Sequence, residues 1–220
     1  MDFVLYHFPG ACSRVVMTAL ETIGVDYEEV VVNIFKGEQK TPDYLKVHPD
    51  GKVPALAMDG QVITENVSIQ LFLNGRFPEA GLLPVFDNPI ENARTVSDLV
   101  WCGGTLHPII RQIRMPIRFT DGDPSGVQAK GVEALHTVLT RVSPRLTSKD
   151  WWHGEEWSLM DVYFAWCCFI AANGGFPIGD YPAIVAHQDR VNSIASYARS
   201  LELEEAARQR LGITLPPSPS

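Results

Sequence analysis

The first 34 residues alternate between strand-like and helix-like apolar patterns, and this alternation constrains the fold more than any other feature of the chain. "FVLYHF" at 3–8 and "YEEVVVNI" at 27–34 are short runs typical of buried strands. The segment 13–23 between them predicts an amphipathic helix, which Gly24 can end. Its apolar face comprises Val15, Val16, Ala19, Leu20 and Ile23. We therefore expect a β-α-β unit whose two strands are parallel.

Residues 53–76 continue this α/β pattern. "VPALAM" and "QVITE" flank Asp59-Gly60, a dipeptide that favours a two-residue hairpin turn. A helix is predicted over about 66–76, and the polar loop before the hairpin has room for a short helix. The predicted order of this first part is therefore β-α-β-β-β-α.

From residue 90 onward the strand signals vanish, and long amphipathic segments predict an all-helical bundle. Their approximate ranges are 90–115, 126–147, 158–173, 182–194 and 197–210. Pro108 should bend or break the first of them, because proline lacks an N–H and its ring clashes with the preceding turn. The proline-rich stretch "FPEAGLLPVFDNP" favours a linker. We expect an α/β domain over 1–76, a linker over 77–89 and a helical domain over 90–220.

Charge and composition exclude several function classes. The net charge of −8 would repel a phosphate backbone, so nucleic acid is not expected as a partner. No apolar run is long enough to cross a membrane, and Asp2 follows Met1 where a secretory signal would carry basic residues. The cysteines and histidines show no spacing typical of a metal site or of a disulfide framework. We expect a cytoplasmic protein with free thiols, no membrane association and no metal.

Four stretches form a specific combination of motifs. They are "PGACS" at 9–13, "KGEQKTPDYLKVHPDGK" at 36–52, "VPAL" at 53–56 with "TEN" at 64–66, and "WSLMDVYFA" at 157–165. With these motifs and its two-part pattern, nearly the whole chain resembles the cytosolic glutathione S-transferases, and it is similar to the bacterial beta class with some phi-like features. The resemblance implies that the first domain has a thioredoxin-like fold and binds glutathione. It also implies that the helical domain lines a hydrophobic co-substrate site.

The resemblance assigns binding roles to residues around "VPAL". Pro54 would follow a cis peptide bond, and the main chain of Val53 would pair with the cysteinyl main chain of glutathione. Glu65 would bind the γ-glutamyl ammonium. Asn66, where the family usually has serine, would hold the γ-glutamyl carboxylate through its amide and the N-terminus of the following helix.

The long loop and the late helix carry the other two implied roles. Lys40 and Lys52 are the candidate cations for the glycine carboxylate of glutathione. Ser158 and Asp161 stand at the spacing of a capping box, which in this family serves folding rather than catalysis.

"PGACS" leaves two candidates for the residue that acts on the glutathione thiol. Cys12 matches the beta class, in which the cysteine faces the glutathione sulfur and can form a mixed disulfide. Ser13, directly before Arg14, matches serine-type classes in which a hydroxyl donates to the thiolate. We favour Ser13 slightly on sequence grounds, because it stands where the helix begins and its hydroxyl can both cap the helix and donate. Cys12 is then its neighbour in the site.

The helical domain supplies candidates for the co-substrate site. His107 matches a histidine that lies near the sulfur in the beta class. Trp101, Arg111 and Met115 accompany it on the same predicted helix and the loop that follows, and the arginine favours an anionic or oxygen-rich group on the co-substrate.

Taken together, the resemblance implies a homodimeric transferase that adds the glutathione thiolate to an electrophilic, hydrophobic small molecule such as an aryl halide, aryl ether or epoxide. Three alternatives stay open. One is thiol–disulfide exchange or deglutathionylation through Cys12. Another is isomerisation with glutathione as cofactor, as in the zeta class, although its "SSCxxR"-like motif is altered here because Arg14 follows Ser13 directly. The third is a non-enzymatic protein that binds glutathione and hydrophobic ligands.

Overall fold

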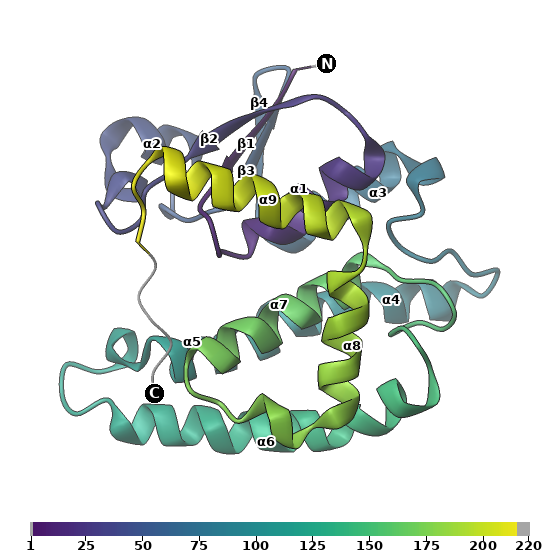
Figure 1. Ribbon diagram of the computed structural model, residues 1–220. Coiled ribbons are helices and arrows are strands. Elements are labelled where there is room, and N and C mark those ends of the chain that lie inside the picture. Colours follow the sequence, from purple (N-terminus) through teal and green to yellow (C-terminus); the bar gives the residue numbers. More distant parts are fainter. Residues whose placement is uncertain (1, 215–220) are drawn as a thin grey trace. The chain divides into compact units, whose positions relative to one another are not determined.

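The computed structural model describes residues 2–214, which form two compact units (Figure 1). One unit contains the chain up to Leu82 together with Ile194–Thr214, and the other contains Leu83–Ser193. The boundary after Leu82 falls within the predicted linker. The segment 194–214 differs from expectation, because it was predicted as part of the helical domain but packs with the first unit. Residues 215–220 of that predicted domain lie outside the described residues.

A four-stranded mixed sheet forms the centre of the first unit. Its strands are β1 (Phe3–His7), β2 (Tyr27–Val31), β3 (Ala55–Met58) and β4 (Gln61–Thr64), in the order β2-β1-β3-β4. β1 pairs with β2 in parallel and with β3 antiparallel, as the β-α-β and hairpin predictions require. Asp59 and Gly60 both have positive φ, of 50° and 80°, which is the geometry of a two-residue hairpin turn. The predicted topology of this part is confirmed.

Helices cover this sheet. They are α1 (Ser13–Ile23), α2 (Pro42–Val47), preceded by a 3₁₀ turn at Glu38–Lys40, and α3 (Asn66–Arg76). α1 ends at Gly24, whose left-handed conformation lets its N–H bond to the carbonyl of Leu20. The unit's core is made of fully buried side chains from β1, β3, α1 and α3. Its members include Leu5, Val15, Val16, Leu20, Leu56, Ile69 and Leu73.

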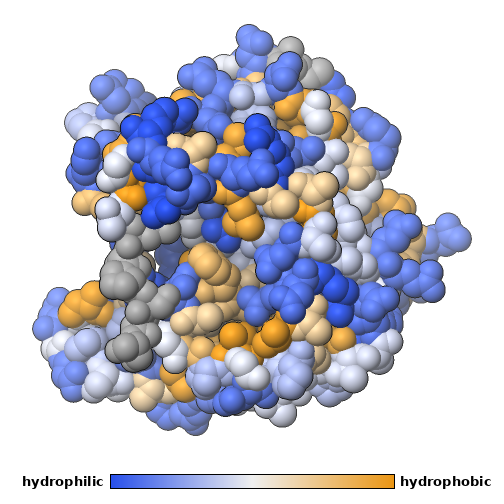
Figure 2. Space-filling model, in the orientation of Figure 1, coloured by the Kyte–Doolittle hydropathy of each residue, from blue (hydrophilic) through white to orange (hydrophobic). Residues whose placement is uncertain are grey.

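The last described helix, α9 (Ala195–Arg210), packs against α1 within the same unit (Figure 1). Its buried face carries Tyr197, Ser200, Glu204 and Ala207 at helical spacing, whereas many residues on its outward side are hydrophilic (Figure 2). Because α9 covers α1, all of Ser13–Leu20 is buried rather than one apolar face alone. Three polar residues of α1, Arg14, Thr18 and Thr22, have side-chain partners on α9; Thr18, for example, bonds to Ser200, with 3.1 Å between the hydroxyl oxygens.

The second unit is helical, as predicted. It contains α4 (Pro89–Trp101), α5 (His107–Arg114), α6 (Ser125–Ser148), α7 (Leu159–Asn173) and α8 (Pro182–Asn192). The predicted interruption near Pro108 takes the form of a π-helical turn over Cys102–Leu106, after which Pro108 stands in the first turn of α5. The capping box of α7 is also present: Asp161 accepts hydrogen bonds from the N–H and the hydroxyl of Ser158, at 2.9 and 3.0 Å.

Candidate active site

The loop between β1 and α1 brings Cys12 next to the predicted cis-proline. Cys12 is the N-cap residue of α1, and its Sγ lies 3.8 Å from the carbonyl oxygen of Val53, within hydrogen-bond range for sulfur. The Val53-Pro54 peptide bond is cis, as the resemblance implies. The thiol therefore faces the main chain that would pair with glutathione, although only 7% of Cys12 is exposed.

Ser13 lies in a different environment. Its side chain is fully buried, and its hydroxyl donates to the carbonyl of Phe8 at 3.2 Å while accepting from the N–H of the same residue at 3.4 Å. The loop turns back on itself through Gly10, whose φ of 82° favours glycine. Ser13 is the first residue of α1 and not its N-cap, which is Cys12. The only proton of the Ser13 hydroxyl is directed at the Phe8 carbonyl.

The start of α3 brings the next two predicted residues beside this loop. Glu65 is the N-cap of α3, and its backbone has φ 67° and ψ 118°, a strained combination for a residue other than glycine. Strain of this kind gathers at ligand-binding sites. The amide Nδ2 of Asn66 donates to the carbonyl oxygen of Cys12 at 2.6 Å. This hydrogen bond joins the first residue of α3 to Cys12, which lies 54 positions earlier in the chain.

The two predicted lysines lie in one charged cluster with Glu65. The Nζ of Lys52 is 3.7 Å from Asp50 and 4.0 Å from Glu65, and the Nζ of Lys40 donates to the carbonyl of Asp50 at 3.0 Å. At Gly51, with φ 60°, a Cβ would lie 2.4 Å from the main-chain oxygen of Gln39, so only glycine lets the two loops come this close. The cluster combines exposed cations with exposed carboxylates, which suits a ligand carrying both charges.

Sequence reasoning missed two side chains that support this cluster. Tyr44, on α2, donates its hydroxyl proton to the carbonyl of Lys52 at 2.6 Å, and burial raises the pKa of this tyrosine, so the donor stays protonated. His48 ends α2 and is buried beneath the charged residues, and burial lowers its pKa despite the nearby Asp50. Both residues belong to the motif "YLKVHPDGK", but nothing in that pattern distinguishes them from packing residues.

In the second unit, His107 and Arg111 form a single network at the start of α5. The Nε of Arg111 donates to His107 Nε2 at 3.2 Å, so the imidazole is neutral and its Nδ1–H is directed at the Tyr163 hydroxyl, 3.0 Å away. Burial, together with the Arg111 charge, lowers the pKa of His107 to about 3. The ring also packs edge-on against Trp166, with centroids 4.7 Å apart. Met115 follows immediately as the C-cap residue of α5.

Trp101 belongs to another cluster of the same unit. Its indole stacks on Trp152 with centroids 5.8 Å apart, and the Arg141 guanidinium lies 5.3 Å from its centre. Trp152 in turn donates its indole N–H to Asp98 at 2.8 Å. The sequence predicted that Trp101 lines the same pocket as His107, Arg111 and Met115, whereas these contacts place Trp101 and His107 in two separate groups. The π-helical turn between the two residues changes the face of the helix on which each of them lies.

Among residues 2–214, no group of three or more His, Cys, Asp or Glu side chains is arranged to hold a metal ion. No helix in this part of the chain is long and apolar enough to span a membrane.

Known proteins bear out the resemblance. Residues 1–74 match the family described as glutathione S-transferase, N-terminal domain. Glutathione S-transferase Z1 of Arabidopsis thaliana is 38% identical over 203 residues, which cover 89% of each chain. The chain belongs to the glutathione S-transferase family. It is therefore an enzyme of the transferase class with a thioredoxin-like first domain and with glutathione as co-substrate.

Solved structures of this family agree over the whole fold. A bacterial beta-class glutathione S-transferase of Sphingomonas chungbukensis has a TM-score of 0.81 at 30% identity, covering 91% of this chain and 98% of that one. A glutathione transferase homologue of Sulfitobacter with bound glutathione has a TM-score of 0.80 at 25% identity, covering 97% and 99%. The family and fold inferred from the motifs are confirmed.

Proposed function

We propose that this glutathione S-transferase transfers the glutathione thiolate to an electrophilic, largely apolar small molecule, and that Cys12 is the residue nearest the reacting sulfur. The contact between Cys12 Sγ and the carbonyl of Val53 carries this proposal. If the glutathione main chain pairs with Val53, as in β-strand addition, the cysteinyl side chain of glutathione is delivered toward Cys12. Cys12 is also the N-cap residue of α1, and the N-terminus of a helix favours negative charge on a nearby sulfur.

The remaining groups of the cluster match the charges of glutathione. Glu65 would pair with the γ-glutamyl ammonium, and Lys40 and Lys52 would bind the glycine carboxylate. The Tyr44 hydroxyl donates a hydrogen bond to the carbonyl of Lys52 and so holds the main chain from which the lysine side chain extends. The Lys52 side chain lies near Glu65 and Asp50, so these charged groups are partly paired with one another.

We assign the contact with the sulfur to Cys12 rather than Ser13. The Ser13 hydroxyl proton is used by the Phe8 carbonyl inside the loop, and the side chain has no exposed surface. Redirecting it to a ligand would leave a buried carbonyl without its donor, which costs about 1–3 kcal/mol. The slight sequence preference for Ser13 is therefore not supported by its hydrogen bonds.

Thiol–disulfide exchange is a second candidate, and the same thiol favours it. In this reaction the Cys12 thiolate attacks the glutathione sulfur of a mixed disulfide between glutathione and another thiol, a disulfide forms between Cys12 and glutathione, and the other thiolate leaves. A free glutathione thiolate then attacks this disulfide, restores the Cys12 thiolate and releases oxidised glutathione. The other cysteines, Cys102, Cys167 and Cys168, are buried in the helical unit, so the exchange uses a single protein thiol.

Isomerisation is less well supported. Its zeta-class motif relies on an arginine, whereas Arg14 is buried and its guanidinium is bound to Glu204 and Tyr197 within the first unit. This arginine is thus engaged in packing α9.

We assign the co-substrate to the side of the helical unit that carries His107, Arg111 and Met115. A neutral imidazole and an arginine beside aromatic rings suit an apolar molecule with an oxygen-rich substituent. Trp101 is a weaker candidate, because its ring already contacts Trp152 and Arg141.

We further propose a cytoplasmic homodimer. Val96 and Val100 stand four residues apart on α4 with 37% and 54% of their surface exposed, and Val62 of β4 is 41% exposed. Apolar side chains of this kind suit a contact with a second copy. Sedimentation at micromolar concentration should show about twice the 24.4 kDa mass of one chain.

Calorimetry and turnover test the transferase proposal together. Glutathione should bind without added metal, and Glu65→Gln should weaken binding about tenfold or more, because one partner of a charged hydrogen bond is lost. Turnover is measured with glutathione and a panel of aryl halides, aryl ethers, epoxides, hydroperoxides and mixed disulfides. Binding without turnover of any member would favour a non-enzymatic binding protein, and unchanged affinity in Glu65→Gln would remove Glu65 from the site.

A further inference from the structure

The side chain of Asn66 is turned toward the protein interior. Its Nδ2 donates to the carbonyl oxygen of Cys12 at 2.6 Å, and its Oδ1 accepts from the Nε2 of Gln70 at 2.6 Å. Asn66 is 7% exposed and Gln70 is fully buried. Gln70, Asn66 and the Cys12 main chain thus form one buried chain of hydrogen bonds from α3 to the start of α1.

The direction of both amides is fixed by their partners. A carbonyl can only accept, so the NH₂ group of Asn66 must face Cys12 and its oxygen must face Gln70. The Oδ1 of Asn66 can only accept, so the group of Gln70 that faces it must be the NH₂ group. Because Asn66 and Gln70 are four residues apart, they stand one above the other on α3, and neither amide can flip without placing two like atoms together.

We propose that Asn66 and Gln70 are positioning residues that hold and polarise the Cys12 main chain, rather than ligands of the γ-glutamyl carboxylate. This inference rests on the proposed role of Cys12. The γ-glutamyl carboxylate is then left to the main-chain N–H groups in the first turn of α3. The family's usual serine is shorter than asparagine, so its hydroxyl could not span the same distance to Cys12.

The bond acts on the Cys12 sulfur through the peptide group. A donor on the Cys12 carbonyl draws electron density from the peptide that joins Cys12 to Ser13, the first residue of α1. Hydrogen bonds in such chains polarise one another, so the N-terminus of α1 becomes a better environment for a thiolate. Loss of the bond should therefore make the Cys12 thiolate less stable, even where the fold is intact.

The test measures alkylation of Cys12 by iodoacetamide in the absence of glutathione, followed by peptide mass spectrometry across pH 5–9. The variants are Gln70→Met and Asn66→Ser, with Gln61→Met on β4 as an exposed control. The charged cluster of Lys40, Asp50, Lys52 and Glu65 and the buried pair of Arg14 and Glu204 are the same in every variant. Thermal unfolding of each variant confirms that it is folded.

We expect Gln70→Met and Asn66→Ser to slow Cys12 alkylation about three- to tenfold near neutral pH and to move its midpoint to higher pH, with Gln61→Met unchanged. Glutathione affinity should change less than about threefold in Gln70→Met. Faster alkylation would instead indicate simple loosening of the loop and overturn the proposal. The proposal would also be overturned if Asn66→Ser left the rate of Cys12 alkylation unchanged but weakened glutathione binding at least tenfold, because Asn66 would then be a ligand of glutathione. Because alkylation needs no glutathione, failure of wild-type protein to bind glutathione would contradict the proposed function alone.

Discussion

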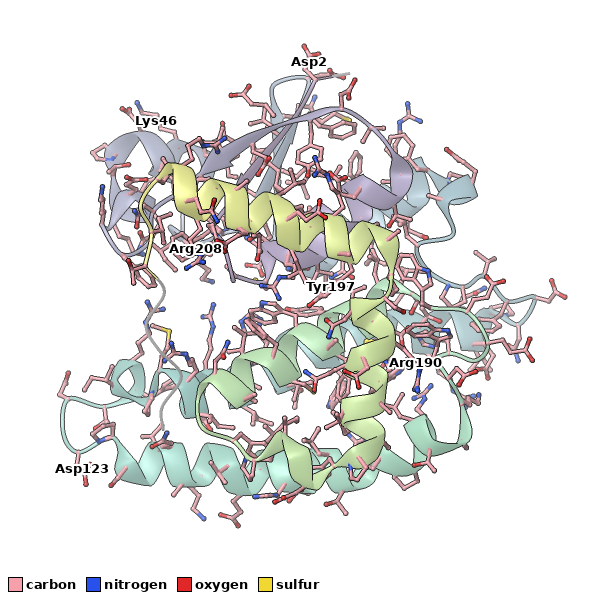
Figure 3. All side chains as sticks on the ribbon, in the orientation of Figure 1. Asp2, Lys46, Asp123, Arg190, Tyr197 and Arg208 are labelled. Atoms are coloured by element: carbon pink, nitrogen blue, oxygen red, sulfur yellow. The ribbon has the colours of Figure 1, made fainter. Side chains whose placement is uncertain are left out.

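The guanidinium of Arg14 donates two hydrogen bonds to one carboxylate oxygen of Glu204, from Nε at 3.1 Å and from Nη2 at 2.7 Å. Both side chains are about 95% buried, and Glu204 lies on α9, 190 residues after Arg14. Tyr197 and Arg208 lie near the two ends of this helix (Figure 3). The ion pair is therefore a main reason why the last helix belongs to the first unit.

Glu204→Ala should lower the free energy of unfolding by about 3–5 kcal/mol, because it leaves the Arg14 charge buried without its partner. Glu205→Ala is the matched control, since its pair with Arg208 is only half-buried and is partly screened by water. Chemical denaturation measures both. The double variant Arg14→Met/Glu204→Leu should recover most of the loss, because two apolar side chains replace two charges. Equal stability of Glu204→Ala and wild type would show that the pair does not hold α9.

The lowered pKa of His107 predicts a pH dependence of stability. The folded protein holds this imidazole neutral down to about pH 3, whereas the unfolded chain binds a proton below about pH 6.5. The unfolded state therefore gains protons first, so the stability from this group is complete above pH 7 and falls as the pH drops toward 3. At pH 5 the loss should be about 2 kcal/mol.

Denaturation of wild type and His107→Gln at pH 7.5 and pH 5 isolates this effect from the other titrating groups. Wild type should lose about 2 kcal/mol more than the variant between the two pH values. An identical loss of unfolding free energy in both proteins would mean that His107 is protonated in the folded state at pH 5. A protonated imidazole cannot accept the hydrogen bond from Arg111, so that bond would not exist.

Asp161 should matter more for stability than its place outside the active site suggests. Its buried carboxylate accepts from the N–H of Trp152 at 2.7 Å and from Ser158, and it contacts His187 Nε2 at 2.9 Å. Asp161→Ala should cost more than about 3 kcal/mol, because several buried donors lose their acceptor at once. Ser158→Ala should cost only about 1 kcal/mol. Thermal unfolding that ranks the two variants in the opposite order would contradict this account of the capping box.

Local chemistry made much of the fold predictable from the sequence. Gly24 ends α1 and Asp59-Gly60 makes the hairpin turn where predicted, because positive φ is needed there and few other residues supply it. The place of α9 was not predictable. Its inner face carries Glu204 and Ser200, so its apolar pattern is weak and its partners lie about 180 residues away.

In the candidate site, too, the sequence predicts some features and leaves others open. The residues around Val53, Pro54 and Glu65 could be found because a motif fixes their main-chain geometry. The roles of Cys12, Ser13 and Asn66 depend on which way each side chain turns. Ser13 turns inward because Phe8 offers both a donor and an acceptor inside the loop, and Asn66 turns inward because Gln70 fixes its amide. Neither preference is visible in the order of residues.

We propose that Cys12, not Ser13, meets the glutathione sulfur. Intact-mass measurement after incubation with oxidised glutathione tests it most directly, because a mixed disulfide can form only on a thiol that the ligand reaches. Wild type and Ser13→Ala should each gain one glutathione, located at Cys12 by peptide mapping and released by excess reduced glutathione, and Cys12→Ala should gain none. A glutathione found on another cysteine, or none on wild-type protein that binds reduced glutathione, would contradict the account.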